Sequence, residues 1–283
     1  MTENLHRLSK LMSQRGLSSR READKLIEQG LVKVDGKMVN TLGIKFPDTV
    51  EITLTKRAQD IQDERITIMI NKPVGYVSGQ AEDDYIPAVR LIKDETHSML
   101  DETKRKLQAK HFNGLAPAGR LDIDSQGVLV LTQDGRIAKQ LIGADTKLEK
   151  EYLVRVDNEV TQEQLDNLSF GLELDGKPLK RAKVKQINED QLQFILLEGK
   201  KRQIRRMCEA VGLHVSGLKR VRVGELRLGK LAEGEWRFVE PKEFQHRPSS
   251  NSQVKNRQRS NSSSKSMKSP KKKSLYGQGK KRT

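Results

Sequence analysis

The chain has 283 residues with 54 Lys and Arg against 38 Asp and Glu, for a formal net charge of +16. Residues 248–283 hold 11 of the basic side chains and no acidic one, so residues 1–247 carry only +5. Clustered Lys and Arg displace phosphate counterions, which favours a nucleic-acid partner.

Several protein classes are excluded by composition. A single cysteine excludes an internal disulfide framework and a cysteine-rich zinc site, and the five histidines show no metal-ligand spacing. No apolar run approaches the roughly 18 residues of a membrane span, and the N-terminus lacks the apolar core of a signal peptide. We therefore expect a cytoplasmic protein without membrane contact.

The first predicted elements are two helices and a hairpin. An apolar stripe predicts a helix over 5–16, and a second helix begins after Ser19, whose spacing to Glu22 matches a capping box. An Asp-Gly pair inside the apolar segment 31–39 predicts a tight hairpin, and 50–54 predicts a further strand. The polar segment 56–64 is interpreted as a linker.

A longer α+β region follows. Its apolar segments predict strands at 65–71, 127–132, 152–156, 182–187 and 192–197. Helices are predicted at 136–142, after Thr161 and at 202–211. The polar stretch 93–115 is interpreted as a long loop or insertion. The Ser/Lys-rich stretch 248–283 has too little apolar content to offset the entropy of ordering, and we expect a disordered basic tail.

Basic residues gather around the turn between the two N-terminal helices: Lys10, Arg15, Arg20, Arg21 and Lys25. Guanidinium groups at a helix start, where backbone N–H groups also face outward, form a reasonable phosphate site. Acidic residues interleave with them, so a solvated helix surface fits the charges equally well. Charge alone leaves both interpretations open.

The amino-acid pattern of this segment identifies its type more specifically than its charge does. It reads LxxLSxxMxxxGLSSRREA, followed by LIxxGxVxVDG, and it resembles an S4 RNA-binding domain over nearly the whole of residues 1–60. The resemblance implies binding of structured RNA through the Arg-rich helical face. S4 domains usually position RNA and perform no chemistry.

The most distinctive later segment is GRLDIDSQG, residues 119–127, directly before an apolar strand. A loop fixed by a buried strand is a common place for reactive groups. Spacing alone does not say whether Asp122 or Asp124 is the important carboxylate, and an Arg–Asp pair that only pins the loop is equally possible. By themselves, Tyr152 fits a core position and Arg205 fits a solvated or phosphate-binding arginine.

The separated motifs occur together in one order: NKPVG, GRLDIDSQGVLVLTQDG, KEYLV, KKRQIRRMCE and GEWR. Together they resemble the RsuA/RluB/RluE/RluF family of S4-domain pseudouridine synthases, and within it the RluF type. The resemblance implies a catalytic domain over 61–247, with a mainly antiparallel mixed sheet and flanking helices, after the S4-type domain and before the tail. Residues 77–80 and 93–115 depart from the family pattern.

The resemblance also implies roles for four residues. Asp122 is the essential carboxylate, Arg120 lies near the vacated base position, Tyr152 stacks on the target base, and Arg205 forms an ion pair with Asp122. Uridine isomerisation breaks the N1–C1′ bond and rejoins the rotated base through C5, so we expect neither a cofactor nor a metal. A base in a duplex must flip out to react.

The expected substrate is large-subunit rRNA near the peptidyl-transferase centre, with small-subunit rRNA or a tRNA anticodon loop left open, and we expect a monomer. The main alternative is a non-catalytic S4-domain RNA-binding or ribosome-assembly factor, which could lose Asp122, Tyr152 and Arg205. The segment 171–177 matches the start of a P-loop, but Pro178 replaces the Ser/Thr and lacks an N–H, so a turn is expected. A glycosidase pair of Asp122 and Asp124 would leave the basic domain unexplained.

Overall fold

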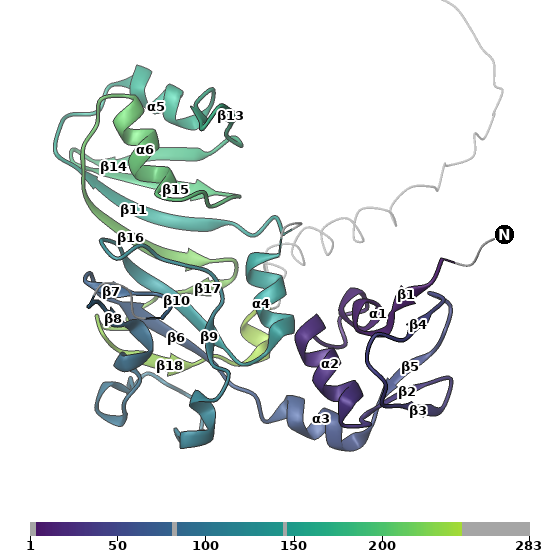
Figure 1. Cartoon of the computed structure of the whole chain (residues 1–283). Coiled ribbons are helices and arrows are strands. Elements are labelled where there is room, and N and C mark those ends of the chain that lie inside the picture. The colour runs from purple at the N-terminus through teal and green to yellow at the C-terminus, as the bar shows by residue number, and fades with distance from the viewer. Residues whose placement is uncertain (1–3, 81–83, 144–145, 245–283) are drawn as a thin grey trace, which may run out of the picture. The chain divides into compact units, whose positions relative to one another are not determined.

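The computed structural model describes residues 4–80, 84–143 and 146–244 (Figure 1). The predicted disordered tail at 248–283 lies outside these residues. Within them, no helix has the length and apolar character needed to cross a membrane. The same part of the chain contains no group of three or more His, Cys, Asp or Glu side chains arranged to hold a metal ion.

The N-terminal part contains β1 (His6–Arg7), α1 (Leu8–Gln14), α2 (Arg20–Glu28), β2 (Val32–Val34), β3 (Lys37–Val39), β4 (Lys45–Phe46), β5 (Ile52–Leu54) and α3 (Lys56–Asp63). The predicted capping box is confirmed, because Ser19 Oγ accepts from Glu22 N at 3.3 Å and Ser19 N donates to Glu22 Oε2 at 3.2 Å. The predicted hairpin is also confirmed. Asp35 and Gly36 have φ values of 48° and 76°, which a tight hairpin turn requires.

The segment 56–64, interpreted as a linker from its polar composition, forms a helix, α3. Thr55 caps this helix by accepting a hydrogen bond from Ala58 N at 3.3 Å. Ala58 is buried in the N-terminal core, and the buried Gln62 amide donates to Glu22 Oε1 at 2.7 Å. Since only an alanine and a glutamine of α3 are buried, the helix has no apolar stripe that sequence patterning could detect.

The following part is built on one sheet. Its elements are β6 (Thr67–Lys72), β7 (Tyr76–Val77), β8 (Ile86–Pro87), β9 (Ala116–Pro117), β10 (Gln126–Thr132), α4 (Gly135–Ile142), β11 (Lys150–Val156), α5 (Gln162–Ser169), β12 (Glu173–Leu174), β13 (Lys177–Pro178), β14 (Lys183–Asn188), β15 (Gln191–Leu196), α6 (Gln203–Ala210), β16 (Val215–Val223), β17 (Leu226–Arg227) and β18 (Trp236–Phe238). The sheet order is β14-β15-β11-β16-β10-β6-β18, with β9 beside β10 and β17 beside β16. Within this sheet the described strands pair antiparallel except β10 and β16, so the predicted mixed, mainly antiparallel sheet is confirmed.

Residues 128–131 of β10 are apolar without interruption because both faces of the strand are buried. Val128 and Val130 belong to the core that includes Ile137 of α4. Leu129 belongs to the core on the opposite face, with Trp236 of β18. The central strands therefore hold the loop before β10 on a rigid support.

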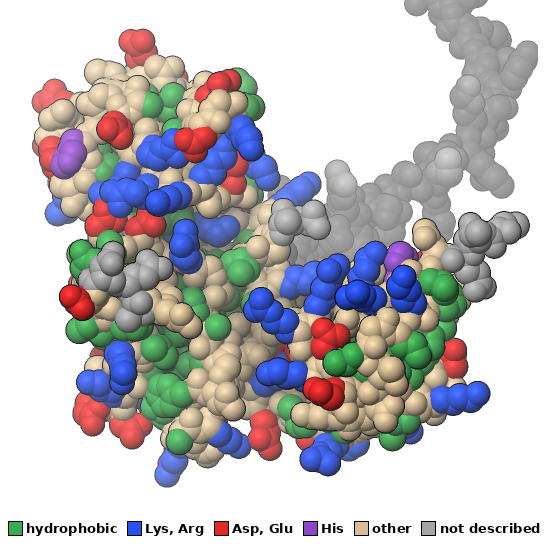
Figure 2. All heavy atoms as spheres, viewed as in Figure 1, with side chains coloured by type: hydrophobic (Ala, Val, Ile, Leu, Met, Phe, Trp, Pro, Cys, Tyr) green, Lys and Arg blue, Asp and Glu red, His purple; other side chains and the backbone are tan. Residues whose placement is uncertain are grey.

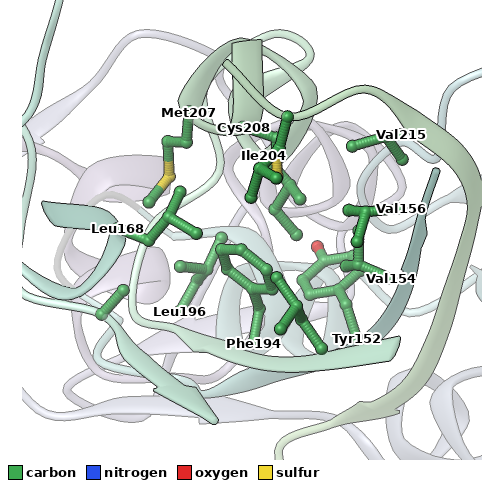
Figure 3. Packing of buried hydrophobic residues seen from close by; sticks show 13 residues of the cluster. Tyr152, Val154, Val156, Leu168, Phe194, Leu196, Ile204, Met207, Cys208 and Val215 are labelled. Carbon is green, nitrogen blue, oxygen red and sulfur yellow. The ribbon is translucent and has the colours of Figure 1, made fainter. Parts of the chain in front are cut away.

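A third core lies under α5 and α6 (Figure 3). It joins side chains of two strands and two helices: Tyr152, Val154, Val156, Phe194, Leu196, Leu168, Ile204, Met207 and Cys208. Burial raises the pKa of the Cys208 thiol to about 12, so this cysteine is an inert core residue. The core fixes both Tyr152 and the first turn of α6.

Strand β16 is the main element that sequence patterning missed. Its nine residues mix Ser, Gly, Lys and Arg with Val and Leu, although Arg220 within it is buried. The expected loop at 93–115 contains short 3₁₀ turns and an isolated β-bridge between His97 and Trp236. The rings of these two residues stack there with centroids 4.2 Å apart. The P-loop-like segment is the turn between β12 and β13, as predicted.

Candidate active site

The four residues that the motifs singled out line one cavity of about 410 Å³: Arg120, Asp122, Tyr152 and Arg205. They come from the loop before β10, from β11 and from the first turn of α6. Sheet order explains the meeting, because β16 lies between β10 and β11 and brings their ends close together. Segments more than 80 residues apart in sequence therefore form a single site.

Asp122 follows a buried residue, Leu121, and is itself half-buried. Among the described residues its carboxylate forms no ion pair. Arg120, two residues earlier, is exposed and reaches the cavity from the same loop. The loop thus presents one carboxylate and one guanidinium to the same space.

The expected ion pair between Arg205 and Asp122 is corrected by the structure, which pairs Arg205 with Asp124. Arg205 Nε lies 3.1 Å from Asp124 Oδ2, without hydrogen-bond alignment, and its Nη2 donates to the Asp124 carbonyl oxygen at 2.7 Å. Arg205 Nη1 donates to Val215 O at 2.9 Å, which ties the guanidinium to the start of β16. Arg202 Nη1 also reaches Asp124 Oδ2, at 2.8 Å. Asp124 therefore anchors two arginines of the α6 region.

Lys72 at the end of β6 is fully buried and lies close to both carboxylates. Its Nζ donates to Pro73 O at 2.7 Å and to Tyr76 O at 2.9 Å. Burial lowers the pKa of this amine to about 8, while the negative charges of Asp124 and Asp122 oppose the shift. Sequence reasoning assigned Lys72 no role, although a lysine that ends an apolar strand is a signal that could have found it.

Tyr152 forms part of the cavity wall and is only 8% exposed. Its ring packs in the core beside Phe194 (Figure 3). An aromatic face held in this way can support a second flat ring with little loss of side-chain entropy. The position therefore suits stacking on a base that enters the cavity.

The remaining wall is strongly basic. Its further cationic side chains are Lys150, Lys180, Lys200, Lys201, Arg202 and Arg220. Burial, together with the positive charges of Arg220 and Lys180, lowers the pKa of Lys150. Figure 2 shows Lys and Arg side chains gathered near β15 and α6, and again over the N-terminal helices. Such a wall fits a phosphate backbone.

The five basic residues predicted to contact RNA in the N-terminal part differ in their exposure and in their contacts within the protein. Arg20, Arg21 and Lys25 on α2 are exposed. Arg15 is also exposed, but its guanidinium donates to Val50 O at 2.6 Å and to Asp48 O at 2.5 Å. Lys10 Nζ lies 3.1 Å from His6 Nδ1. Two of the five predicted RNA contacts therefore already have partners within the protein.

Two known families match the chain. The S4 domain family matches residues 6–46, and the family described as RNA pseudouridylate synthase matches residues 66–210. A crystal structure titled as a pseudouridylate synthase superimposes with a TM-score of 0.58 and 28% identity, covering 84% of this chain and 97% of that one.

Curated relatives match over most of the chain. The Escherichia coli dual-specificity RNA pseudouridine synthase RluF is 36% identical over 82% of this chain and 74% of its own length. The Bacillus subtilis ribosomal large subunit pseudouridine synthase B is 32% identical over 84% of this chain and 94% of its own. An uncharacterized RNA pseudouridine synthase of Aquifex aeolicus is 36% identical, over 84% and 94%.

Proposed function

The chain belongs to the RNA pseudouridine synthases of the RsuA/RluB/RluF type, which are isomerases, and we propose that it modifies specific uridines of large-subunit rRNA through the carboxylate of Asp122. The observation that carries the proposal is the meeting of Asp122, Tyr152 and Arg120 in one basic cavity. A cavity of about 410 Å³ is within the size range of small-molecule sites and can take one extruded nucleotide.

The reaction needs three things from the protein: a carboxylate at the sugar or base, a flat partner for the detached uracil, and a group that fills the vacated position in the RNA. Asp122 supplies the carboxylate, and its freedom from ion pairs within the described chain leaves both oxygens available to substrate. Tyr152 supplies the flat partner. Arg120, exposed on the same loop, supplies a planar guanidinium for the vacated position.

Cationic side chains lie near the loop that carries Asp122. The charge of Lys72 interacts with both Asp122 and Asp124. Arg202 and Arg205 form ion pairs with Asp124.

A second surface, on the N-terminal helices, also binds RNA. Arg20, Arg21 and Lys25 of α2 contact the RNA backbone outside the target nucleotide, with Lys10 and Arg15 at the margin. Backbone contacts of this kind set register and leave the choice of uridine to the cavity. The relative named ribosomal large subunit pseudouridine synthase B supports rRNA as the substrate class.

The test is pseudouridine mapping of total RNA from cells with and without the gene, followed by treatment of the unmodified RNA with the purified full-length protein. We expect a pseudouridine in large-subunit rRNA that disappears with the gene and returns in vitro. A site confined to tRNA or small-subunit rRNA would overturn the substrate assignment. No difference in any RNA, with binding retained, would favour a non-catalytic assembly factor.

A further inference from the structure

In the loop that carries Asp122, the carbonyl groups of five consecutive residues, 120–124, each accept a hydrogen bond. Four of the donors come from other parts of the chain: Arg220 Nη1 to Arg120 O at 3.0 Å, Ser78 Oγ to Leu121 O at 2.6 Å, Gly75 N to Ile123 O at 2.9 Å, and Arg205 Nη2 to Asp124 O at 2.7 Å. The fifth bond, from Ser125 N to Asp122 O at 3.1 Å, lies within the loop.

Ser78 differs from the other donors because it binds both the backbone N–H and the carbonyl group of one residue, Leu121. Its hydroxyl donates to Leu121 O at 2.6 Å and accepts from Leu121 N at 2.9 Å. Ser78 is 7% exposed and Leu121 is 6% exposed, so water cannot readily replace either bond. Leu121 directly precedes Asp122, and its backbone orientation therefore sets the direction of the Asp122 side chain.

Arg220 provides a second support for the loop. Its Nε donates to Val128 O of β10 at 2.8 Å, and its Nη1 donates to Arg120 O. The backbone of Arg220 is itself fixed against β10, because a Cβ on Gly127 would lie 2.1 Å from Arg220 O and the φ of Gly127 is 108°. Only glycine permits this approach.

We propose that Ser78 is a positioning residue for the isomerisation, which sets the direction of the Asp122 carboxylate by binding both backbone groups of Leu121, while Arg220 fixes the preceding residue. This inference rests on the proposed role of Asp122. Ser78 touches no substrate and acts only through Asp122. It falls within 77–80, where the chain departs from the family pattern, so the departure includes part of the site's support.

The test uses the full-length protein and large-subunit rRNA purified from cells that lack the gene. Ser78→Ala should lower the single-turnover rate by about 10- to 100-fold, since small displacements of a reacting group have effects of this size. RNA affinity should stay within roughly twofold of wild type, because binding depends on the basic surfaces. Ser78→Thr, which keeps the hydroxyl, should restore most of the rate, with Ser78→Cys between Thr and Ala.

Ser98→Ala is the matched control. Ser98 is also a buried serine, 4% exposed, and its Oγ donates to Glu235 Oε2 at 2.8 Å, away from the loop of Asp122. Both alanine variants should lose thermal stability, but only Ser78→Ala should lose rate. A Ser78→Ala rate within roughly twofold of wild type, or an equal rate loss in Ser98→Ala, would overturn the positioning role. Failure of the wild-type protein to form pseudouridine would instead overturn the proposed function.

Discussion

Arg205 binds Asp124 in two ways, through an ion pair between Nε and Oδ2 at 3.1 Å and through a hydrogen bond from Nη2 to the Asp124 carbonyl oxygen at 2.7 Å. This contact gives the two carboxylates of the loop different roles. Asp124 stabilises the junction between the loop and α6, whereas Asp122 faces the cavity without an ion pair among the described residues. The two should therefore respond differently to substitution.

Asp122→Asn should reduce isomerisation by at least roughly 10³-fold, because an amide cannot act as a base or a nucleophile in place of the carboxylate. RNA affinity should change little. Asp124→Asn keeps an oxygen acceptor and the carbonyl contact to Arg205, so we expect about a tenfold loss of rate and retained turnover. Single-turnover formation of pseudouridine, with RNA binding measured in parallel, checks both variants. A larger loss in Asp124→Asn than in Asp122→Asn would reverse the assignment.

Tyr152→Leu should lower kcat/KM by about 10- to 100-fold, since stacking of a base on an aromatic ring contributes about 1–3 kcal/mol. Tyr152→Phe keeps the ring and the packing beside Phe194, and should preserve RNA affinity. A Tyr152→Phe variant that is slow despite normal binding would show that the hydroxyl group takes part in a chemical step. Full activity in Tyr152→Leu would remove the stacking role.

The buried Lys72 predicts a specific pH dependence of stability. Its pKa is lowered from 10.5 to about 8 in the folded protein, so between these values the unfolded chain binds the proton that the folded protein has released. The free energy of unfolding should therefore rise with pH through this window, by about 3 kcal/mol relative to a Lys72→Met variant. A neutral amine still has two hydrogens for Pro73 O and Tyr76 O, so the local bonds survive deprotonation.

Urea unfolding of both proteins between pH 7 and about pH 10.5 checks this prediction. The comparison uses the difference between the two proteins, which cancels the contributions of their shared titratable groups. Parallel curves for wild type and Lys72→Met would contradict a depressed pKa at this position.

The α2 arginines should contribute to RNA binding mainly through charge. The double variant Arg20→Ala and Arg21→Ala should weaken binding and lower the slope of log affinity against log salt by about 0.7–0.9 for each lost phosphate contact. Both side chains are exposed, so the thermal stability should stay close to that of the wild type. Binding titrations at several salt concentrations measure the slope.

Lys33→Ala and Lys37→Ala together give a matched control, because they remove two exposed positive charges from β2 and β3. This control should leave the salt slope unchanged. Arg15→Ala should differ from both, since it removes the donor to Val50 O and Asp48 O and should lower thermal stability. Equal salt slopes for the α2 variant and wild type would exclude α2 from the RNA contact surface.

Local sequence patterns predicted much of the fold. The capping box of Ser19 and Glu22 and the Asp35-Gly36 hairpin are recognisable because their interactions join residues three or fewer positions apart. Strand β10 is recognisable because both of its faces are buried and its central residues are apolar. The resemblance to known synthases named Arg120, Asp122, Tyr152 and Arg205, and all four line one cavity.

The sequence alone determined the order of the two domains, the basic character of the proposed RNA-binding surfaces and the residues that line the cavity, because these depend on local pattern and motif identity. The tertiary structure decided which carboxylate Arg205 binds, how deeply Lys72 is buried and where Ser78 and Arg220 hold the loop. It also revealed α3 and β16, whose few apolar or mixed residues become buried only against distant segments. Which residues tens of positions apart come into contact depends on the order of the strands in the sheet. Spacing along the chain does not reveal that order.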